Sequence, residues 1–196
     1  MNSLVKNLRE MDWSNKAIYS QWLAQSYYYT RYSTRMLAFA AGWTENMDQS
    51  YYRRSLKHIA EEQGHDLIAI NDLKGLDCSI ESFKELGTTR ALWECQFYKI
   101  QKDPTFLLGY ILALETLAVK TFKEFNHELL KTYSEKSTHF VKVHADDDPD
   151  HVEEALIQIN KCNTEQQQQI LFNFEQTITM YNCMLQEIKS TVTTIK

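Results

Sequence analysis

Residues that interrupt helices and strands are scarce in this chain, which has only 5 glycines and 2 prolines among its 196 residues. Because glycine and proline punctuate regular elements, few positions remain at which the chain can turn. The stretches between them keep apolar residues at helical spacing, as Ile170, Phe174 and Ile178 do near the C-terminus. That spacing is typical of amphipathic helices and differs from the alternation found in strands. We therefore predict an all-α fold of long helices, without a sheet.

The length of the chain favours one domain over residues 1–196, since a chain of this size can bury a single core. About seven helices are expected. They cover residues 1–13 as a short lead-in, then about 14–41, 48–74, 88–101, 104–133, a stretch that begins at 134 or 137, and 164–191. Two residues disturb this scheme. Gly64 lies inside the third helix, where a close approach by another helix or a ligand would explain it. Pro149 must kink the sixth helix or end it near residue 147.

Charge and composition exclude several classes of function. The formal net charge of -5 and the isoelectric point near 5.7 leave no basic footprint for nucleic acid. The most apolar run, Phe106–Val119, is too short to span a membrane and carries Glu115, so a buried helix is expected there. The start of the chain lacks the apolar core of a secretory signal, and the four cysteines are too scattered for a disulfide framework. These features predict a protein of the reducing cytoplasm.

Two octets, residues 58–65 and 144–151, repeat one arrangement: histidine, three residues, an acid, two residues, histidine. The side chains concerned are His58, Glu62 and His65 in the first octet, and His144, Asp148 and His151 in the second. On a helix, positions i, i+4 and i+7 return to one face, so each octet can present two imidazoles and a carboxylate. Such ligands suit iron, manganese or zinc. We predict a shared metal site with iron as first choice; a solvated helix face is the alternative.

Two further glutamates are candidates for the same site. Glu115 is surrounded in sequence by leucine, alanine and valine, and a buried carboxylate must be paired if it is ionised. Its partner would be the metal or, alternatively, an arginine or lysine of another helix. Glu61 competes with Glu62 because it stands four residues before His65 rather than three. One of the two would face the metal, and the other would form a salt bridge or support a ligand.

A run of tyrosines and arginines occupies the centre of the helix expected at about 14–41. Its candidate substrate-binding residues are Tyr28, Arg31, Tyr32 and Arg35. In one interpretation the tyrosines fill the core and half-buried seams of the bundle. In the other, one or two tyrosine hydroxyls and an arginine face a pocket and hold a polar or anionic group of a substrate.

With the Glu62-x-x-His65 pair, the lone Glu115 and the His144-x3-Asp148-x2-His151 pattern, the chain resembles the heme-oxygenase-like diiron oxidases and oxygenases. These proteins are often described as iron-containing redox enzymes, and they share their fold with TenA-like thiaminase II and pyrroloquinoline-quinone synthase. The resemblance covers residues 19–156 and implies a heme-oxygenase-like helical bundle. It also implies a ligand set for one or two non-heme iron ions, consisting of Glu62, His65, Glu115, His144, Asp148 and His151. His58 and Glu61 are further candidates, and some members carry a glutamate where this chain has His58.

The resemblance implies an iron-dependent oxidoreductase that uses O2 to oxidise a small organic substrate, and a homodimer is expected from the habits of the fold. A metal-free hydrolase of the thiaminase II type is the alternative, and it would need Cys95 or Cys162 as its nucleophile. Heme oxygenase itself is disfavoured because no histidine precedes His58. A non-enzymatic helical protein that binds a ligand is the remaining class.

Overall fold

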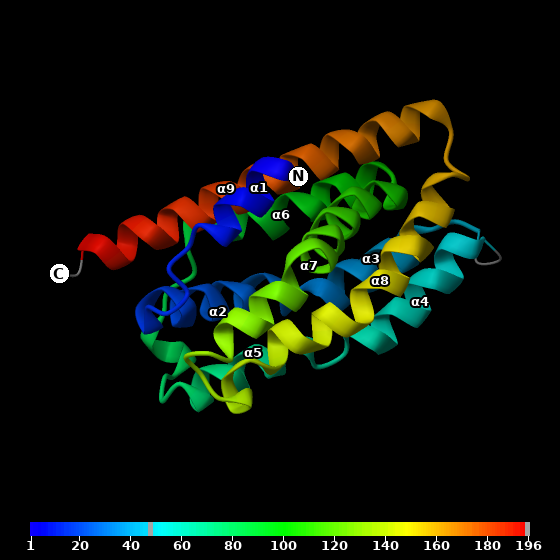
Figure 1. Cartoon of the computed structure of the whole chain (residues 1–196). Helices are drawn as coiled ribbons and strands as arrows, with labels where there is room; N and C mark the ends of the chain where they lie inside the picture. The colour runs from blue at the N-terminus through cyan, green and yellow to red at the C-terminus, as the bar shows by residue number, and fades with distance from the viewer. Residues whose placement is uncertain (47–48, 195–196) are drawn as a thin grey trace.

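The computed structural model describes residues 1–46 and 49–194, and every regular element in that part of the chain is helical. This confirms the predicted all-α class. Figure 1 shows the helices gathered into one bundle, with α9 running along one side of it. The helices are α1 (Asn2–Arg9), α2 (Lys16–Thr30), α3 (Ser33–Trp43), α4 (Ser50–Glu62), α5 (His65–Gly75), α6 (Gly87–Lys102), α7 (Leu107–Leu129), α8 (His139–Ile159) and α9 (Thr164–Thr194), with short 3-10 turns at Ile80–Ser82, Pro104–Phe106 and Glu135–Ser137.

The helix expected at about 14–41 is divided in two, at a position that neither glycine nor proline marks. The Thr30 hydroxyl donates to the Ser26 carbonyl at 2.8 Å, a bond that Thr121 and Thr177 also form inside unbroken helices, so it does not by itself divide the helix. The Tyr32 amide then bonds to the Tyr29 carbonyl at 3.2 Å, which tightens the last turn of α2. As a result α3 begins at Ser33 with a new orientation, and residues on either side of the break face different surroundings.

The helix expected at 48–74 also divides, and here the cause is Gly64. Its φ of 93° lies in the left-handed region, where glycine avoids the penalty that a Cβ atom would bring. Nothing lies within 4 Å of the position that a Cβ would occupy, so the expected close approach of another helix is wrong. Gly64 instead ends α4 after Glu62 and lets α5 start at His65 in a new direction.

Helix α8 continues past Pro149, so the expectation that one helix ends near residue 147 is wrong. Proline removes one intrahelical hydrogen bond, and packing along the length of α7 and against α5 holds α8 on both sides of it. The start of α8 is fixed by Asp72 of α5, whose carboxylate accepts the Phe140 amide at 2.8 Å. His144 and His151 therefore lie on one helix, two turns apart.

Helix α7 is the central element of the bundle, packed between α8 and α9. The stretch Pro104–Leu129 that contains it is long and apolar enough to cross a membrane by length and composition alone, a test that buried core helices also pass. Most of its apolar window, 61%, is buried inside the protein, as in the core helix of a bundle. The expected buried helix is thus observed, and it carries Glu115 at a site that is only 7% exposed.

Candidate metal centre

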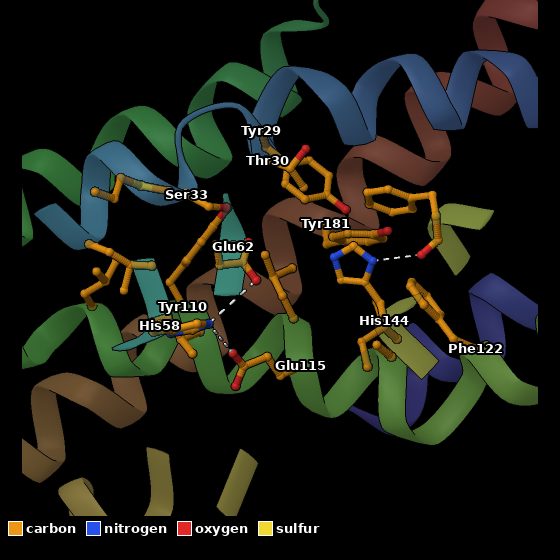
Figure 2. Close-up of a pocket in the computed structure, with 18 residues that line it drawn as sticks. Tyr29, Thr30, Ser33, His58, Glu62, Tyr110, Glu115, Phe122, His144 and Tyr181 are labelled. Carbon is orange, nitrogen blue, oxygen red and sulfur yellow. Dashed lines mark hydrogen bonds and ion pairs between the residues drawn. The ribbon is translucent and has the colours of Figure 1, made fainter. Parts of the chain in front are cut away.

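Four histidines and two glutamates converge in the interior of the bundle from α4, α5, α7 and α8 (Figure 2 draws the cavity beside them). His58, His65 and His151 are buried, with His58 only 3% exposed and His151 only 4% exposed. The two histidines outside the octets, His127 and His139, are exposed. The sequence pattern thus separated the inward-facing histidines from the others.

One end of the cluster, here called the His151 end, consists of His58, His151 and Glu115 together with Glu62. Glu115 Oε1 lies 3.3 Å from His58 Nε2 and 3.7 Å from His151 Nδ1. The two imidazole rings are 4.6 Å apart between centroids. His58 Nε2 also lies 3.6 Å from Glu62 Oε1. Burial lowers the pKa of His151, which favours the neutral imidazole that a metal ion requires.

The other end, here called the His144 end, consists of His65 and His144 together with Glu62. His65 Nδ1 lies 3.5 Å from Glu62 Oε1, and the rings of His65 and His144 are 5.0 Å apart. His144 Nδ1 lies 2.8 Å from the Phe140 carbonyl oxygen. Because a carbonyl only accepts, Nδ1 carries the proton and the lone pair is on Nε2. Histidine ligands of metal ions are commonly oriented by such a bond.

Glu62 belongs to both ends. It forms one group of potential metal ligands with His58 and His151 and another with His65 and His144, and within each group the ligand atoms lie within 4.8 Å of one another. Burial raises the pKa of Glu62, but the neighbouring imidazoles of His58 and His65 outweigh it and hold the pKa well below the ordinary value. The Glu62 carboxylate is therefore ionised, and it can serve two cations at once.

Charged side chains surround the His151 end. Glu61 Oε2 lies 3.3 Å from His151 Nε2, and Lys57 pairs with both Glu61 and Glu154. Arg54 lies on the inner side, with a side chain only 4% exposed. Its guanidinium contacts His58 Nδ1 at 3.0 Å and donates to the His151 carbonyl oxygen at 3.3 Å. The side chain of Glu61 thus supports a candidate ligand from outside, in the position of an outer partner.

The donor set fits a divalent transition metal. Carboxylate oxygen and imidazole nitrogen are the ligands of non-heme iron sites. Among the described side chains of the cluster, four carboxylates face two cationic groups, which leaves two formal negative charges when the imidazoles are neutral. The carboxylates are Glu61, Glu62, Glu115 and Glu154, and the cations are Arg54 and Lys57. Of these, only the side chains of Glu62, Glu115 and Arg54 are at most 11% exposed, and together they carry one net negative charge. A buried net charge is costly unless a further cation offsets it.

The structure brings together seven of the eight side chains proposed as ligands or further candidates. These are His58, Glu61, Glu62, His65, Glu115, His144 and His151. The eighth, Asp148, lies in α8 between His144 and His151, but its side chain is outside the described part of the structure. Its role as a ligand stays a prediction.

A cavity of about 70 Å³ adjoins the cluster, with His58, Glu62, Glu115 and His144 in its wall. Apolar side chains of α3, α7 and α8 make up most of the remaining wall. Its other polar members are Tyr29, Thr30, Ser33, Tyr110 and Tyr181. The sequence did not indicate them, since a buried tyrosine on an apolar helix face has the same pattern as a core residue. Tyr29 and Thr30 are the last residues of α2 and Ser33 is the first of α3, so the junction of the two helices forms one side of the cavity.

The four predicted substrate-binding residues are not among those that line this cavity. The Tyr28 hydroxyl donates to the Phe83 carbonyl oxygen at 2.7 Å, and Arg31 donates to the Tyr32 hydroxyl at 2.9 Å. The Tyr32 ring stacks on the ring of Trp93 in α6, with 3.7 Å between the ring centroids. The Arg35 guanidinium carbon lies over the Tyr32 ring, 5.8 Å from its centroid. A continuous helix was assumed in the prediction, and the break at Thr30 changes which residues face inward.

A family model described as "Iron-containing redox enzyme" matches residues 20–182. The search of curated proteins finds no significant match.

Two solved structures are similar in fold. One is a domain of unknown function with a heme oxygenase-like fold from Shewanella denitrificans OS217, which is 20% identical, with 98% of this chain and 89% of that chain covered and a TM-score of 0.86. The other is a TenA homolog from Pseudomonas syringae pv. tomato strain DC3000, which is 15% identical, with 96% and 89% covered and a TM-score of 0.76. At these identities the likeness establishes the heme-oxygenase-like fold.

Proposed function

The chain belongs to the family of iron-containing redox enzymes, and on that premise we propose that it is a non-heme iron oxidase or oxygenase that uses O2 to oxidise a small organic substrate. The observation that carries this proposal is the position of Glu62, a buried and ionised carboxylate between two pairs of histidines. A carboxylate shared in this way is suited to a centre of two metal ions rather than one. The proposed cofactor is therefore a pair of iron ions.

The residues that would hold the metal ions follow from the two ends of the cluster. Glu62, His65 and His144 would serve one ion, and Glu62, Glu115 and His151 would serve the other. Asp148 is added to the second set by family resemblance. Ferrous iron in such a site supplies one-electron chemistry with O2. The chain's own part is to orient the ligands, as Phe140 does for His144 and Glu61 for His151, and to keep the site dry.

The cavity supports a substrate with a mainly apolar body. No lysine or arginine is among the described residues that line it, so an anionic group of the substrate that lay away from the metal ions would have no cationic partner there. Tyr110 is 3% exposed, and among the described residues its hydroxyl has no hydrogen-bond partner. A polar atom of the substrate would satisfy this hydroxyl and orient the apolar body beside the metal ligands.

The metal-free hydrolase has less support. Neither Cys95 nor Cys162 is among the described lining residues of the cavity. Burial raises the pKa of both thiols, which disfavours the thiolate that a nucleophile needs. The four cysteines are free thiols. They accord with the predicted reducing cytoplasm, which stays a prediction, as does the homodimer.

The experiment that tests the proposed function separates binding from turnover. Protein purified without chelator is titrated anaerobically with Fe(II), and O2 uptake is then followed with amino acids and with fatty acids of increasing chain length. We expect Fe(II) binding in the wild type and O2 uptake that depends on both iron and substrate. His144→Ala should lose O2 uptake and about half of the Fe(II) binding, while the exposed His127→Ala should keep both in full. Wild-type protein that binds no Fe(II) would contradict the proposal.

A further inference from the structure

Arg54 is a buried cation at the centre of the cluster, and neither the sequence pattern nor the family resemblance pointed to it. It lies one helical turn before His58 on α4, and its Nη1 atom is 3.0 Å from His58 Nδ1. Its Nη2 atom donates to the carbonyl oxygen of His151, and its Nε atom lies 3.9 Å from a carboxylate oxygen of Glu154. These contacts tie the guanidinium to both α4 and α8, so its position against His58 is set from two helices.

The contact with Arg54 determines which nitrogen of His58 carries a proton. A guanidinium has only N–H donors and stays protonated in proteins, so it cannot accept a hydrogen bond. At 3.0 Å, His58 Nδ1 must therefore offer its lone pair to Arg54. The proton of the neutral ring is then on Nε2.

The Nε2 atom is the one that faces the metal site. It lies 3.3 Å from Glu115 Oε1 and 3.6 Å from Glu62 Oε1, so an Nε2–H is directed at two carboxylates. To bind a cation there, His58 would have to lose that proton while Nδ1 still accepted from Arg54, which requires an imidazolate. His144 is the opposite case, since its Nδ1–H donates to a carbonyl oxygen and its lone pair is on Nε2.

We propose that Arg54 holds His58 in the Nε2–H tautomer, so that His58 acts as a hydrogen-bond donor to Glu115 and Glu62 and not as a metal ligand. The inference rests on the proposed metal centre and assigns His58 a positioning role within it. The hydrogen bond from His58 Nε2–H to Glu115 Oε1 limits the rotation of the Glu115 carboxylate. It thereby limits which oxygen atoms Glu115 and Glu62 present to the ions, as outer partners do at metal sites.

The tautomer can be read directly by NMR on protein labelled with ¹⁵N-histidine. Long-range ¹H–¹⁵N correlations distinguish a protonated from an unprotonated ring nitrogen, and His58→Gln assigns the signals of His58 among the six histidines. In the metal-free wild type we expect His58 with a protonated Nε2 and an unprotonated Nδ1. After loading with diamagnetic Zn(II), this pattern should persist for His58, whereas the His144 signals should change to those of a bound ring.

Two outcomes would overturn the inference: a metal-free spectrum with the proton on Nδ1 of His58, or loss of the Nε2 proton when Zn(II) binds. If Zn(II) and Fe(II) alter none of the four clustered histidines, the proposed metal centre fails, and the metal-free spectrum still decides the tautomer. Arg54→Met provides a check on the cause. Because Glu115 and Glu62 still accept from Nε2–H, the signal that should change is that of His58 Nδ1, which no longer accepts from a guanidinium, while the His144 signals stay the same. An unchanged Nδ1 signal would overturn the role of Arg54.

Fe(II) affinity provides an independent readout. His58→Gln keeps an N–H donor near the position of Nε2, whereas His58→Leu has none. We expect His58→Leu to weaken anaerobic Fe(II) binding about 10-fold, which is the lower end of the effect seen for residues that hydrogen-bond to metal ligands. His58→Gln should bind Fe(II) nearly as well as the wild type does. The matched change at a proposed ligand, His144→Gln, should cost more than about 100-fold. Equal losses in His58→Gln and His144→Gln would overturn the inference, and far-UV circular dichroism verifies that each variant is folded.

Discussion

The two ends of the metal cluster use histidines from the same two octets, yet their surroundings differ. At the His144 end, the ring of His144 is oriented by a backbone carbonyl. At the His151 end, charged side chains contact both rings, with Arg54 against His58 and Glu61 against His151. Identical spacing in the sequence therefore does not imply identical chemistry. The tautomer and role of each imidazole depend on what its second nitrogen contacts.

The comparison also shows how the octets combine. His58 of the first octet pairs with His151 of the second, and His65 pairs with His144. Each octet thus supplies one histidine to each end. His144 and His151 are two turns apart on α8, about 10 Å along its axis, and the break at Gly64 separates His58 on α4 from His65 on α5. The histidines therefore form two groups of potential ligands that share Glu62.

The largest effect is expected for Glu62→Gln, because Glu62 is the only described residue that belongs to both groups of potential ligands. Replacing its carboxylate by an amide should weaken Fe(II) binding at both ends by more than about 100-fold. Isothermal titration under anaerobic conditions measures this loss. The exposed Glu94→Gln on α6 is the control and should bind as the wild type does. If the Glu62→Gln protein still binds two equivalents of Fe(II) as tightly as the wild type, Glu62 is not a ligand shared by two ions.

His144→Ala and His151→Ala should each remove one end and spare most of the other. We expect each variant to bind about half of the iron that the wild type binds, since each lacks a ligand of one ion only. Metal analysis of anaerobically loaded and desalted protein gives the stoichiometry. If either variant loses all of its iron, the two ends do not bind independently, and the comparison between them would have to be abandoned in favour of one joint site.

Gly64→Ala should affect the His144 end through the backbone. A Cβ in the left-handed conformation costs about 1–2 kcal/mol, and no neighbouring atom adds to that cost. Relief of the strain would turn His65 away from Glu62, so metal binding should weaken at the His144 end. Thermal unfolding measures the loss of stability. Gly42→Ala, in helix α3 with nothing within 4 Å of its Cβ position, is the control and should be neutral or stabilising by up to about 1 kcal/mol.

Glu61→Gln should give the smallest effect and should be confined to the His151 end. The amide keeps an oxygen acceptor for His151 Nε2 but loses the charge and the pairing with Lys57. We expect about a 10-fold weaker Fe(II) affinity at that end, in the range of outer partners. Titrations in the His144→Ala background isolate the His151 end. An unchanged Fe(II) affinity at that end would show that Glu61 pairs with Lys57 and does not orient His151.

The sequence predicted the helical class and the clustering of the histidines because both depend on local periodicity and on residue type. The break after Thr30 was not predictable, since no glycine or proline marks it within a stretch of good helical pattern. Tyr110 and Tyr181 of the cavity were missed because a buried tyrosine on an apolar helix face has the same pattern as a core residue. The contact of Arg54 with His58 was not anticipated either, because an arginine one turn before a histidine is common on any exposed helix.

We infer that Glu62 lies between two metal ions, one at each end of the cluster. Crystals of protein loaded anaerobically with Fe(II) can be measured by anomalous scattering at the iron edge. We expect two peaks, one beside His65 and His144 and one beside His151 and Glu115, with the Glu62 carboxylate in contact with both. A single peak that Glu62 does not touch, or imidazoles turned away from an iron-free interior, would rule the shared site out.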